Sequence, residues 1–358
     1  MSKKKNLVTK LFQHNECDIE LYTISNSLGL AVDILNYGAR ITSIRIPTRH
    51  LLNPFEDVVL GYSSYADYLQ DTDYMNAIIG RVANRIRNSQ FSINGKKYTL
   101  PANEGIHHLH GGLQGFDSKI WRFSEFIEHS SYSGIKLALN SPHLDQGYPG
   151  NIKIDLSFVL TEDNRLVIKT YAASDSDTII SITNHNYWNF NGHADHYADI
   201  SNHVLCIPTN LTCNIDEHGL PDGTFSNILN TDYDFHKPRK FHRDFLNQGG
   251  IDTNYCFHNS SESQSSAELY SPKTGLGVSI TSDLPGLQCY TGNQMQNNYR
   301  GKFKRSYGPK YGICLEPQHY PDAINQCNFP SSLIRINETY EKTITMLFND
   351  SYPIDLNT

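Results

Sequence analysis

The segment that most constrains the fold is a pair of alternating stretches in the middle of the chain. In NIKIDLSFVL (151–160), isoleucine, leucine and phenylalanine alternate with lysine, aspartate and serine, which is the period of a half-buried strand. A short turn, TEDN (161–164), leads into a second β-rich stretch, RLVIKTYAAS (165–174). Together these segments predict an antiparallel hairpin.

Similar strand signals recur along the whole chain, at 30–47, 91–100, 133–140, 275–284 and 340–349. Helical signals are few, and the best is SSYADYLQD (63–71) with a serine as its N-cap. Many strands at hairpin spacing, with 24 glycines and 15 prolines, favour an all-β antiparallel sandwich over any βαβ arrangement. No shift in composition marks a linker, so residues 1–358 are predicted to form a single domain, with the Ser-rich stretch 258–266 as a hairpin loop.

Charge and composition exclude several classes of protein. A net charge of -7 and a pI near 6.1 argue against a nucleic-acid binder, which needs a basic face. The first residues lack the apolar segment of a secretory signal, and no stretch approaches membrane-spanning length. The seven cysteines show no C-x-x-C spacing and are predicted to be free thiols in a reducing compartment. We therefore expect a cytoplasmic protein without nucleic-acid or membrane partners.

Three histidines stand together in GIHHLHGG (105–112). In an extended segment, His108 and His110 point to one face, and imidazoles are suitable zinc ligands. No second motif with metal-ligand spacing accompanies them, so a loop of hydrogen-bonding histidines is the favoured interpretation and a metal site is the alternative. DTD (71–73) and DSD (175–177) are interpreted as solvated turns, because aspartate favours turns.

The stretch SITNHNYWNFNGH (181–193) is rich in amides and aromatic rings. As a strand, it places His185 and Tyr187 on one face and Trp188 on the other. Amides and histidine can bond sugar hydroxyls, and a ring can stack on the C–H face of a sugar. A carbohydrate-binding strand and a strand edge whose amides bond nearby loops are both open interpretations.

Glu316 lies in an apolar run, GICLEPQHYPDAINQ (312–326). A buried carboxylate without a partner is costly, so Glu316 is either a satisfied core acid or a catalytic base. Other polar groups of interest are Asn84 and Arg85 in GRVANRIRN, Asp252 in GIDTNYCF, and Gln288 in LPGLQCYTGN. Two acids, histidines, an arginine and amides, without a serine or cysteine nucleophile, suit proton transfer on a polyhydroxylated molecule.

The motifs also occur in a familiar order. NYGARITSI, IIGRVANRI, HLHGG, GYPG, TNHNYWN, GIDTNY, GLQCYTGN and GICLEPQHYPDAINQ follow one another from about Asn36 to Pro330. Each motif is weak alone, but the ordered set is specific and covers most of the chain. On these residues the sequence resembles the aldose 1-epimerases, the galactose mutarotases.

The resemblance implies a galactose-mutarotase-like antiparallel β-supersandwich with an open sugar cleft and neither cofactor nor metal. The implied reaction interconverts the α and β anomers of free aldoses such as D-galactose and D-glucose. Glu316 is the implied general base and His185 the general acid, and His110 assists at the ring oxygen or anomeric centre. The implied sugar-binding or orienting residues are Asn84, Arg85, Asp252 and Gln288.

Some positions depart from the family pattern. Thr253 and His107 replace a common histidine and a common asparagine, Trp188 and Phe190 are larger than usual, and the loop at 49–56 is altered. These departures leave the preferred sugar open, including a sugar phosphate or a disaccharide. A non-catalytic or regulatory sugar-binding protein and a metal-dependent β-sandwich enzyme are further alternatives. A monomer and a homodimer are both compatible with the sequence.

Overall fold

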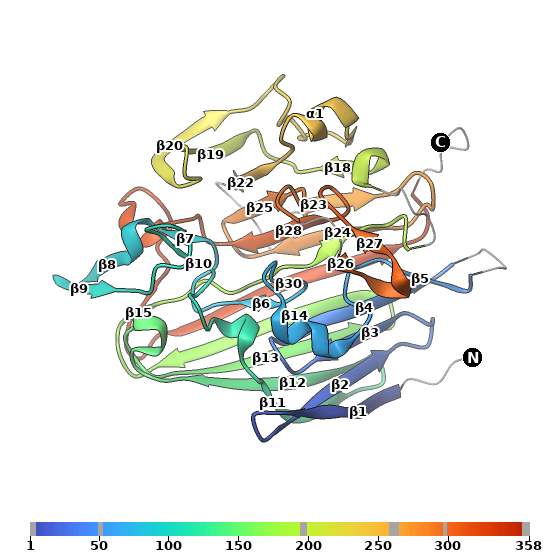
Figure 1. Ribbon diagram of the computed structural model, residues 1–358, viewed down its shortest axis with the longest axis horizontal. Coiled ribbons are helices and arrows are strands. Elements are labelled where there is room, and N and C mark those ends of the chain that lie inside the picture. The colour runs from blue at the N-terminus through green and yellow to red at the C-terminus, as the bar shows by residue number, and fades with distance from the viewer. Residues whose placement is uncertain (1–4, 49–52, 194–198, 258–264, 296–298, 353–358) are drawn as a thin grey trace.

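The computed structural model describes residues 5–48, 53–193, 199–257, 265–295 and 299–352 (Figure 1). Its regular secondary structure is almost entirely β-strand, which confirms the predicted all-β class with few short helices. The described residues contain one α-helix, α1 (Arg243–Asn247), and short 3-10 helices: η1 (Tyr65–Gln70), η2 (Arg87–Ser89), η3 (Phe116–Ser118), η4 (Asp145–Gly147), η5 (Ile200–Asn202), η6 (Lys302–Lys304) and η7 (Ala323–Asn325).

The largest sheet has nine strands in the order β11-β12-β13-β14-β30-β24-β23-β18-β21. Their bounds are β11 Arg122–Glu128, β12 Tyr132–Ser141, β13 Ile152–Thr161, β14 Arg165–Ser174, β30 Thr339–Asn349, β24 Gly277–Ser282, β23 Ser265–Tyr270, β18 Val204–Cys206 and β21 Arg239–Lys240. Strands β13 and β14 form the predicted hairpin, and buried residues alternate with more exposed ones along both. One face of this sheet therefore faces the core.

Two further sheets complete the core. The five-stranded sheet runs in chain order: β1 Lys5–His14, β2 Cys17–Ser25, β3 Ala31–Leu35, β4 Arg40–Pro47 and β5 Phe55–Asp57. The six-stranded sheet has the order β17 Tyr187–Trp188, β28 Ile313–Gln318, β25 Gly286–Tyr290, β22 Asp252–Cys256, β19 Leu211–Ile215 and β20 Pro221–Asn227. In Figure 1 its strands β22, β25 and β28 lie above β30 and β14 of the large sheet. A continuous apolar cluster joins strands of all three sheets.

Five two-stranded sheets hold the connecting segments. They pair β6 (Ile78–Ile79) with β16 (Thr183–Asn184), β7 (Arg85–Ile86) with β10 (His108–Leu109), β8 (Gln90–Ile93) with β9 (Lys96–Thr99), β15 (Thr178–Ile179) with β29 (Leu333–Ile334), and β26 (Tyr299–Arg300) with β27 (Ser306–Tyr307). The β7–β10 pair places Arg85 opposite Leu109. It thereby brings the GRVANRIRN and GIHHLHGG segments together.

Other predicted features were found with small differences. The segment at 63–71 forms η1, a 3-10 helix whose N-cap Ser64 accepts a hydrogen bond from the Ala66 amide, as expected for a serine cap. None of the seven cysteines forms a disulfide. Residues 258–264 of the predicted Ser-rich loop and 49–52 of the altered loop lie outside the described residues. Within the described part of the chain, no helix combines the length and apolar character needed to cross a membrane.

Candidate functional site

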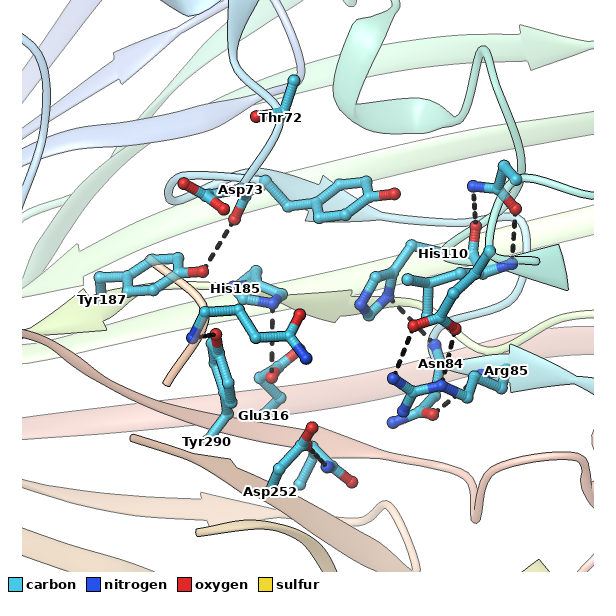
Figure 2. A pocket seen from close by; sticks show the side chains of 16 residues that line it. Thr72, Asp73, Asn84, Arg85, His110, His185, Tyr187, Asp252, Tyr290 and Glu316 are labelled. Atoms are coloured by element: carbon cyan, nitrogen blue, oxygen red, sulfur yellow. Dashed lines mark hydrogen bonds and ion pairs between the residues drawn. The ribbon is translucent and has the colours of Figure 1, made fainter. Parts of the chain in front are cut away.

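A polar cleft of about 240 Å³ collects all seven residues that the sequence singled out (Figure 2). Its lining residues are Thr72, Asp73, Tyr74, Asn84, Arg85, Asn103, Glu104, Leu109, His110, His185, Tyr187, Asp252, Gln288, Tyr290, Gln294 and Glu316. They come from segments far apart in the sequence. The cleft is therefore a product of the tertiary fold rather than of one motif.

Strand register explains why three of these residues share one surface. In the six-stranded sheet, Gln288 of β25 lies directly opposite Glu316 of β28, and Asp252 of β22 lies opposite Tyr290 of β25. Directly opposed residues in antiparallel strands project from the same face. Pro317 follows Glu316 within β28 and favours the extended backbone that aims its carboxyl at the cleft.

Thr253 follows Asp252 on β22 and therefore projects from the opposite face of the sheet. It pairs with Cys289 of β25 and is nearly buried, as is its neighbour Tyr255 on the same face. Thr253 departs from the family pattern and left the preferred sugar open, but it does not line the cleft.

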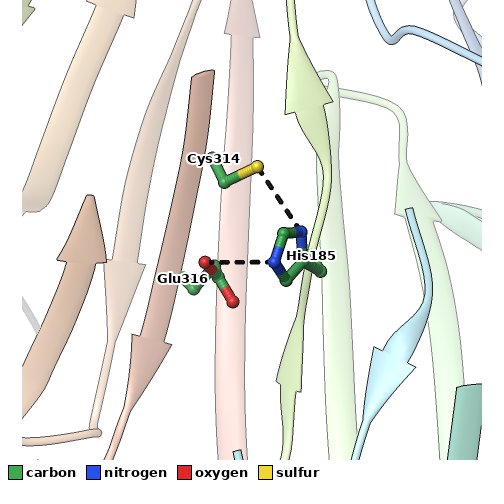
Figure 3. A group of neighbouring side chains, drawn as sticks. All are labelled: His185, Cys314 and Glu316. Carbon is green, nitrogen blue, oxygen red and sulfur yellow. Dashed lines mark hydrogen bonds and ion pairs between the residues drawn. The ribbon is translucent and has the colours of Figure 1, made fainter. Parts of the chain in front are cut away.

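His185 faces Glu316 at the base of the cleft. The predicted continuous strand is broken here, because β16 ends at Asn184 and β17 begins at Tyr187. His185 Nε2 lies 3.7 Å from Glu316 Oε1, and His185 Nδ1 lies 3.4 Å from Cys314 Sγ (Figure 3). Both side chains of the His185–Glu316 pair are almost fully buried. The break in the strand thus aims His185 at the strand that carries Glu316.

Burial favours the neutral forms of this pair. It raises the pKa of the Glu316 carboxyl well above its ordinary value, and the charge of Asp252 adds to that rise. Burial lowers the pKa of the His185 imidazole to about 4. These shifts favour a protonated Glu316 carboxyl beside a neutral His185 imidazole. At 3.7 Å the two atoms are too far apart for a direct hydrogen bond.

His110 presents a hydrogen-bond donor to the cleft. Its Nδ1 accepts a hydrogen bond from the Asn84 backbone amide at 3.1 Å. Burial lowers the pKa of His110 well below its ordinary value, and the nearby His185 contributes to the shift. A neutral imidazole whose Nδ1 accepts carries its proton on Nε2. The ring of Tyr74 packs edge-on against His110, with centroids 4.6 Å apart, and fixes its position.

Two polar pairs form the remaining wall. Arg85 donates two hydrogen bonds to Glu104, from Nε at 2.7 Å and from Nη2 at 2.8 Å. The Gln288 amide donates to Asp252 Oδ1 at 2.7 Å. Glu104 was not singled out in the sequence, although an acid upstream of the histidine cluster is a natural counter-charge for Arg85.

Several polar atoms around the cleft still lack partners. Glu316 Oε2, Gln288 Oε1 and Asp73 Oδ2 are buried and make no hydrogen bond within the described residues. Burial raises the pKa of the Asp73 carboxyl to about 6, with a further contribution from Asp71. Buried polar atoms are normally satisfied, so such a group of exceptions points to a polar ligand.

The expectation that His108 and His110 share one face needs correction. His108 does not share a face with His110, because His110 has a left-handed φ of 50° and the alternation ends there. His108 instead bonds the Pro101 carbonyl and the Tyr148 hydroxyl, each at 2.7 Å, and supports the loop. Trp188 is fully buried and stacks on Phe190 in the core, whereas His185 and Tyr187 line the cleft, as expected for the two faces of this segment.

The expectation for DTD (71–73) was also wrong. Asp71 is buried and forms an ion pair with Arg40 at 2.6 Å, and Asp73 lines the cleft. The place of Asp71 is set by a partner 31 residues earlier, which local sequence does not reveal. Arg81 is buried as well and bonds the carbonyl of Pro149 and the side chain of Ser141, outside the cleft. In DSD (175–177), by contrast, Asp175 is exposed as expected.

Among the described residues, one set of side chains offers metal-ligand atoms within 4.8 Å of one another: His185, Cys314 and Glu316. Cys314 approaches Nδ1 of the imidazole, whereas Glu316 approaches Nε2. An ion bound through either nitrogen would then lie beside only one of the other two ligands (Figure 3). The observed geometry is poorly suited to a zinc site, in which one imidazole nitrogen joins the other ligands around a single ion.

Comparison with known proteins places this cleft in a family. Residues 20–347 match the aldose 1-epimerase family. Curated relatives include the galactose mutarotase of Rattus norvegicus, 34% identical over 322 residues, which cover 89% of this chain and 91% of the relative. They also include the aldose 1-epimerase of Escherichia coli (strain K12), 30% identical over 329 residues, which cover 89% of this chain and 92% of the relative.

Solved structures agree with the sequence comparison. A galactose 1-epimerase from Lactobacillus acidophilus NCFM superposes with a TM-score of 0.84 at 25% identity, over 98% of this chain and 100% of that chain. A GalM/aldose epimerase homologue from C. elegans gives a TM-score of 0.82 at 25% identity, over 93% of this chain and 99% of that chain. The fold expected from the sequence resemblance is confirmed.

Proposed function

Because the chain belongs to the aldose 1-epimerase family and is an isomerase, we propose that it interconverts the α and β anomers of free aldoses by proton transfer between the sugar, His185 and Glu316. D-Galactose and D-glucose are the proposed substrates. The observation that carries the proposal is the buried His185–Glu316 pair, 3.7 Å apart, at the base of a polar cleft with unpartnered oxygens.

The reaction needs one proton to leave the C1 hydroxyl and one to reach the ring oxygen. In the proposed step, the Glu316 carboxylate takes the C1 hydroxyl proton while His185 donates a proton to the ring oxygen. The C1–O5 bond breaks and C1 becomes an aldehyde. Rotation about C1–C2 and the reverse transfers close the ring on the other face. The resting neutral pair and the reactive charged pair hold the same number of protons and differ only in where one proton lies.

The other polar groups would hold the sugar. His110 would donate from Nε2 to the ring oxygen or anomeric hydroxyl, since its Nδ1 is already occupied. Arg85 and Asp252 would bind hydroxyls remote from C1, and Gln288 would orient Asp252 and offer its free Oε1. Asn84 would fix His110 through its backbone amide. Such positioning holds the reacting atoms near their productive geometry.

The direct test is polarimetry of freshly dissolved α-D-galactose and α-D-glucose with the purified chain and a chelator. We expect both sugars to reach their equilibrium rotation faster than with buffer alone. Heat-inactivated protein serves as the control. No acceleration with either sugar would contradict the proposal, and acceleration that the chelator abolishes would contradict the metal-free mechanism.

The pH profile gives a second test. Burial raises the pKa of Glu316 and lowers that of His185 to about 4, so the pair holds one proton over a wide range. We therefore expect kcat/KM to be bell-shaped, with an acid limb near pH 4 and an alkaline limb well above the usual glutamate range. With ordinary values of about 4.3 and 6.5, the same species would be lost above about pH 6.5. A profile that stays flat from acid to alkaline pH would contradict the proposed pair.

We also propose that the chain acts as a single domain in the cytoplasm. The apolar cluster that joins the three sheets contains residues from Tyr22 to Phe348, which supports one folding unit. The seven cysteines, none of which forms a disulfide, support a reducing compartment.

A further inference from the structure

A second cavity, of about 680 Å³, adjoins the cleft and is called the outer cavity here. It is lined by Gly105–His107 and Ile215–Gly219 together with Arg85, Glu104, Asp252 and Gln294, and the last four residues also line the cleft. His185 and Glu316 line only the cleft. A sugar whose C1 lies at the His185–Glu316 pair would therefore direct its remote hydroxyls toward the outer cavity.

His107 lies in the wall of this cavity and carries an unused hydrogen-bond donor. Its Nδ1 accepts a hydrogen bond from the Asn88 backbone amide at 3.1 Å. Burial lowers the pKa of His107, so the ring is neutral and its proton lies on Nε2. That atom has no hydrogen-bond partner within the described residues, and His107 is only 6% exposed. A buried donor left without a partner is costly unless a ligand satisfies it.

Other side chains in the wall of the outer cavity are apolar. Ile106 and Ile215 line the cavity and are 66% and 42% exposed. The His218 ring lies over His107, with centroids 5.4 Å apart and planes tilted by 47°. Exposed aliphatic side chains and rings beside hydrogen-bonding groups suit a pyranose, which has apolar C–H faces and polar hydroxyl edges.

The charges disfavour an anionic substituent. Arg85 is engaged by Glu104, and Arg87 donates to Asp216 at 2.9 Å, so both nearby guanidinium groups are already paired. Asp216 and Glu217 add carboxylates to the lining. A phosphate would require cations that are free to bind it, so a neutral hydroxylated group fits the outer cavity better.

We propose that the outer cavity is a second sugar-binding site, which holds the non-reducing sugar of a reducing disaccharide while the reducing sugar lies at His185 and Glu316. This rests on the proposed mutarotase activity. His107 and His218 then determine the preference for disaccharides over monosaccharides, and they take no part in the proton transfers.

The test compares kcat/KM for α-lactose and α-D-galactose, and for maltose and α-D-glucose, by polarimetry. The variants are His218→Ala, which removes an exposed ring, and His107→Phe, which keeps a ring but removes the donor. His242→Ala, an exposed histidine outside both cavities, is the matched control. We expect each test variant to lower the disaccharide-to-monosaccharide ratio by about three- to tenfold, with galactose turnover unchanged, because one hydrogen bond or ring contact is lost.

Three outcomes would contradict the proposal of a second sugar-binding site. The first is that the protein accelerates the mutarotation of galactose but not that of lactose or maltose. The others are an unchanged disaccharide-to-monosaccharide ratio of kcat/KM in both test variants, and a preference for glucose 6-phosphate over glucose. No acceleration of any sugar by the unmodified protein would instead refute the mutarotase activity itself. The use of two variants separates a lost contact from a local folding defect, since His218 is exposed and tolerates truncation.

Discussion

Glu316→Gln is expected to lower kcat/KM for galactose by about 10² to 10⁴ while leaving the protein folded. The amide has the shape of the carboxyl but cannot accept the C1 hydroxyl proton. Galactose binding, measured by calorimetry, should be largely kept, because the amide can still bond a hydroxyl. The matched control is Glu341→Gln, an exposed glutamate on β30. Turnover within about threefold of the unmodified protein would exclude Glu316 as the base.

The same variant has a predicted effect on stability. The folded-state pKa of Glu316 lies above its unfolded value, so the folded protein binds this proton more tightly and loses stability as pH rises through the usual glutamate range and beyond. An amide cannot ionise and avoids that loss. We therefore expect a higher Tm for Glu316→Gln than for the unmodified protein at pH 8, but not at pH 4. This exchange of stability for activity is typical of catalytic groups.

His185→Asn is the companion variant, since the two side chains are proposed to act as one unit. It should lose about as much activity as Glu316→Gln, and the double variant should lose little more than either single one. Fully multiplicative losses would indicate that the two residues act in separate steps.

Asp71→Asn is expected to lower the free energy of unfolding by about 3–5 kcal/mol. The Asp71 carboxylate accepts hydrogen bonds from Arg40 at 2.6 Å, from the Tyr62 hydroxyl at 2.6 Å and from the Met75 amide at 2.7 Å. The Arg40 and Asp71 side chains are 1% and 0% exposed. Removal of this charge leaves the buried guanidinium without the carboxylate that it is hydrogen-bonded to. Urea unfolding followed by fluorescence measures the change.

The matched control for this prediction is Asp163→Asn. Asp163 pairs with Arg165 at 2.7 Å, but the Arg165 and Asp163 side chains are 44% and 62% exposed. A solvated pair contributes at most about 1 kcal/mol. A loss of less than about 1 kcal/mol in Asp71→Asn as well would show that the buried pair is dispensable.

Local patterns predicted the strands better than their arrangement. The alternation in 151–174 was sufficient to predict β13 and β14, because it reports directly on a half-buried surface. The pairing of β14 with β30 joins segments more than 160 residues apart, and nothing in the sequence of either strand indicates which strand it pairs with. Sheet order therefore had to come from the structure.

The residues of the candidate site also differ in how readily the sequence reveals them. Glu316 and His185 are prominent in the sequence because an acid in an apolar run and an amide-rich strand are unusual. Asp73 and Glu104 line the cleft but stand in ordinary turn-like contexts, so composition alone does not single them out. The proton distribution in the pair also escaped sequence reasoning, because it depends on how deeply both groups are buried.

Strand β30 occupies an unusual place for the last strand of the described chain. It lies between β14 and β24, in the middle of the nine-stranded sheet. During synthesis, β14 and β24 leave the ribosome before β30. Until β30 is made, each has unpaired backbone groups along the edge that β30 will occupy. Exposed edges of this kind recruit other chains. We therefore expect nascent chains that lack β30 to aggregate readily. Binding of chaperones to these edges until translation is finished would prevent that aggregation.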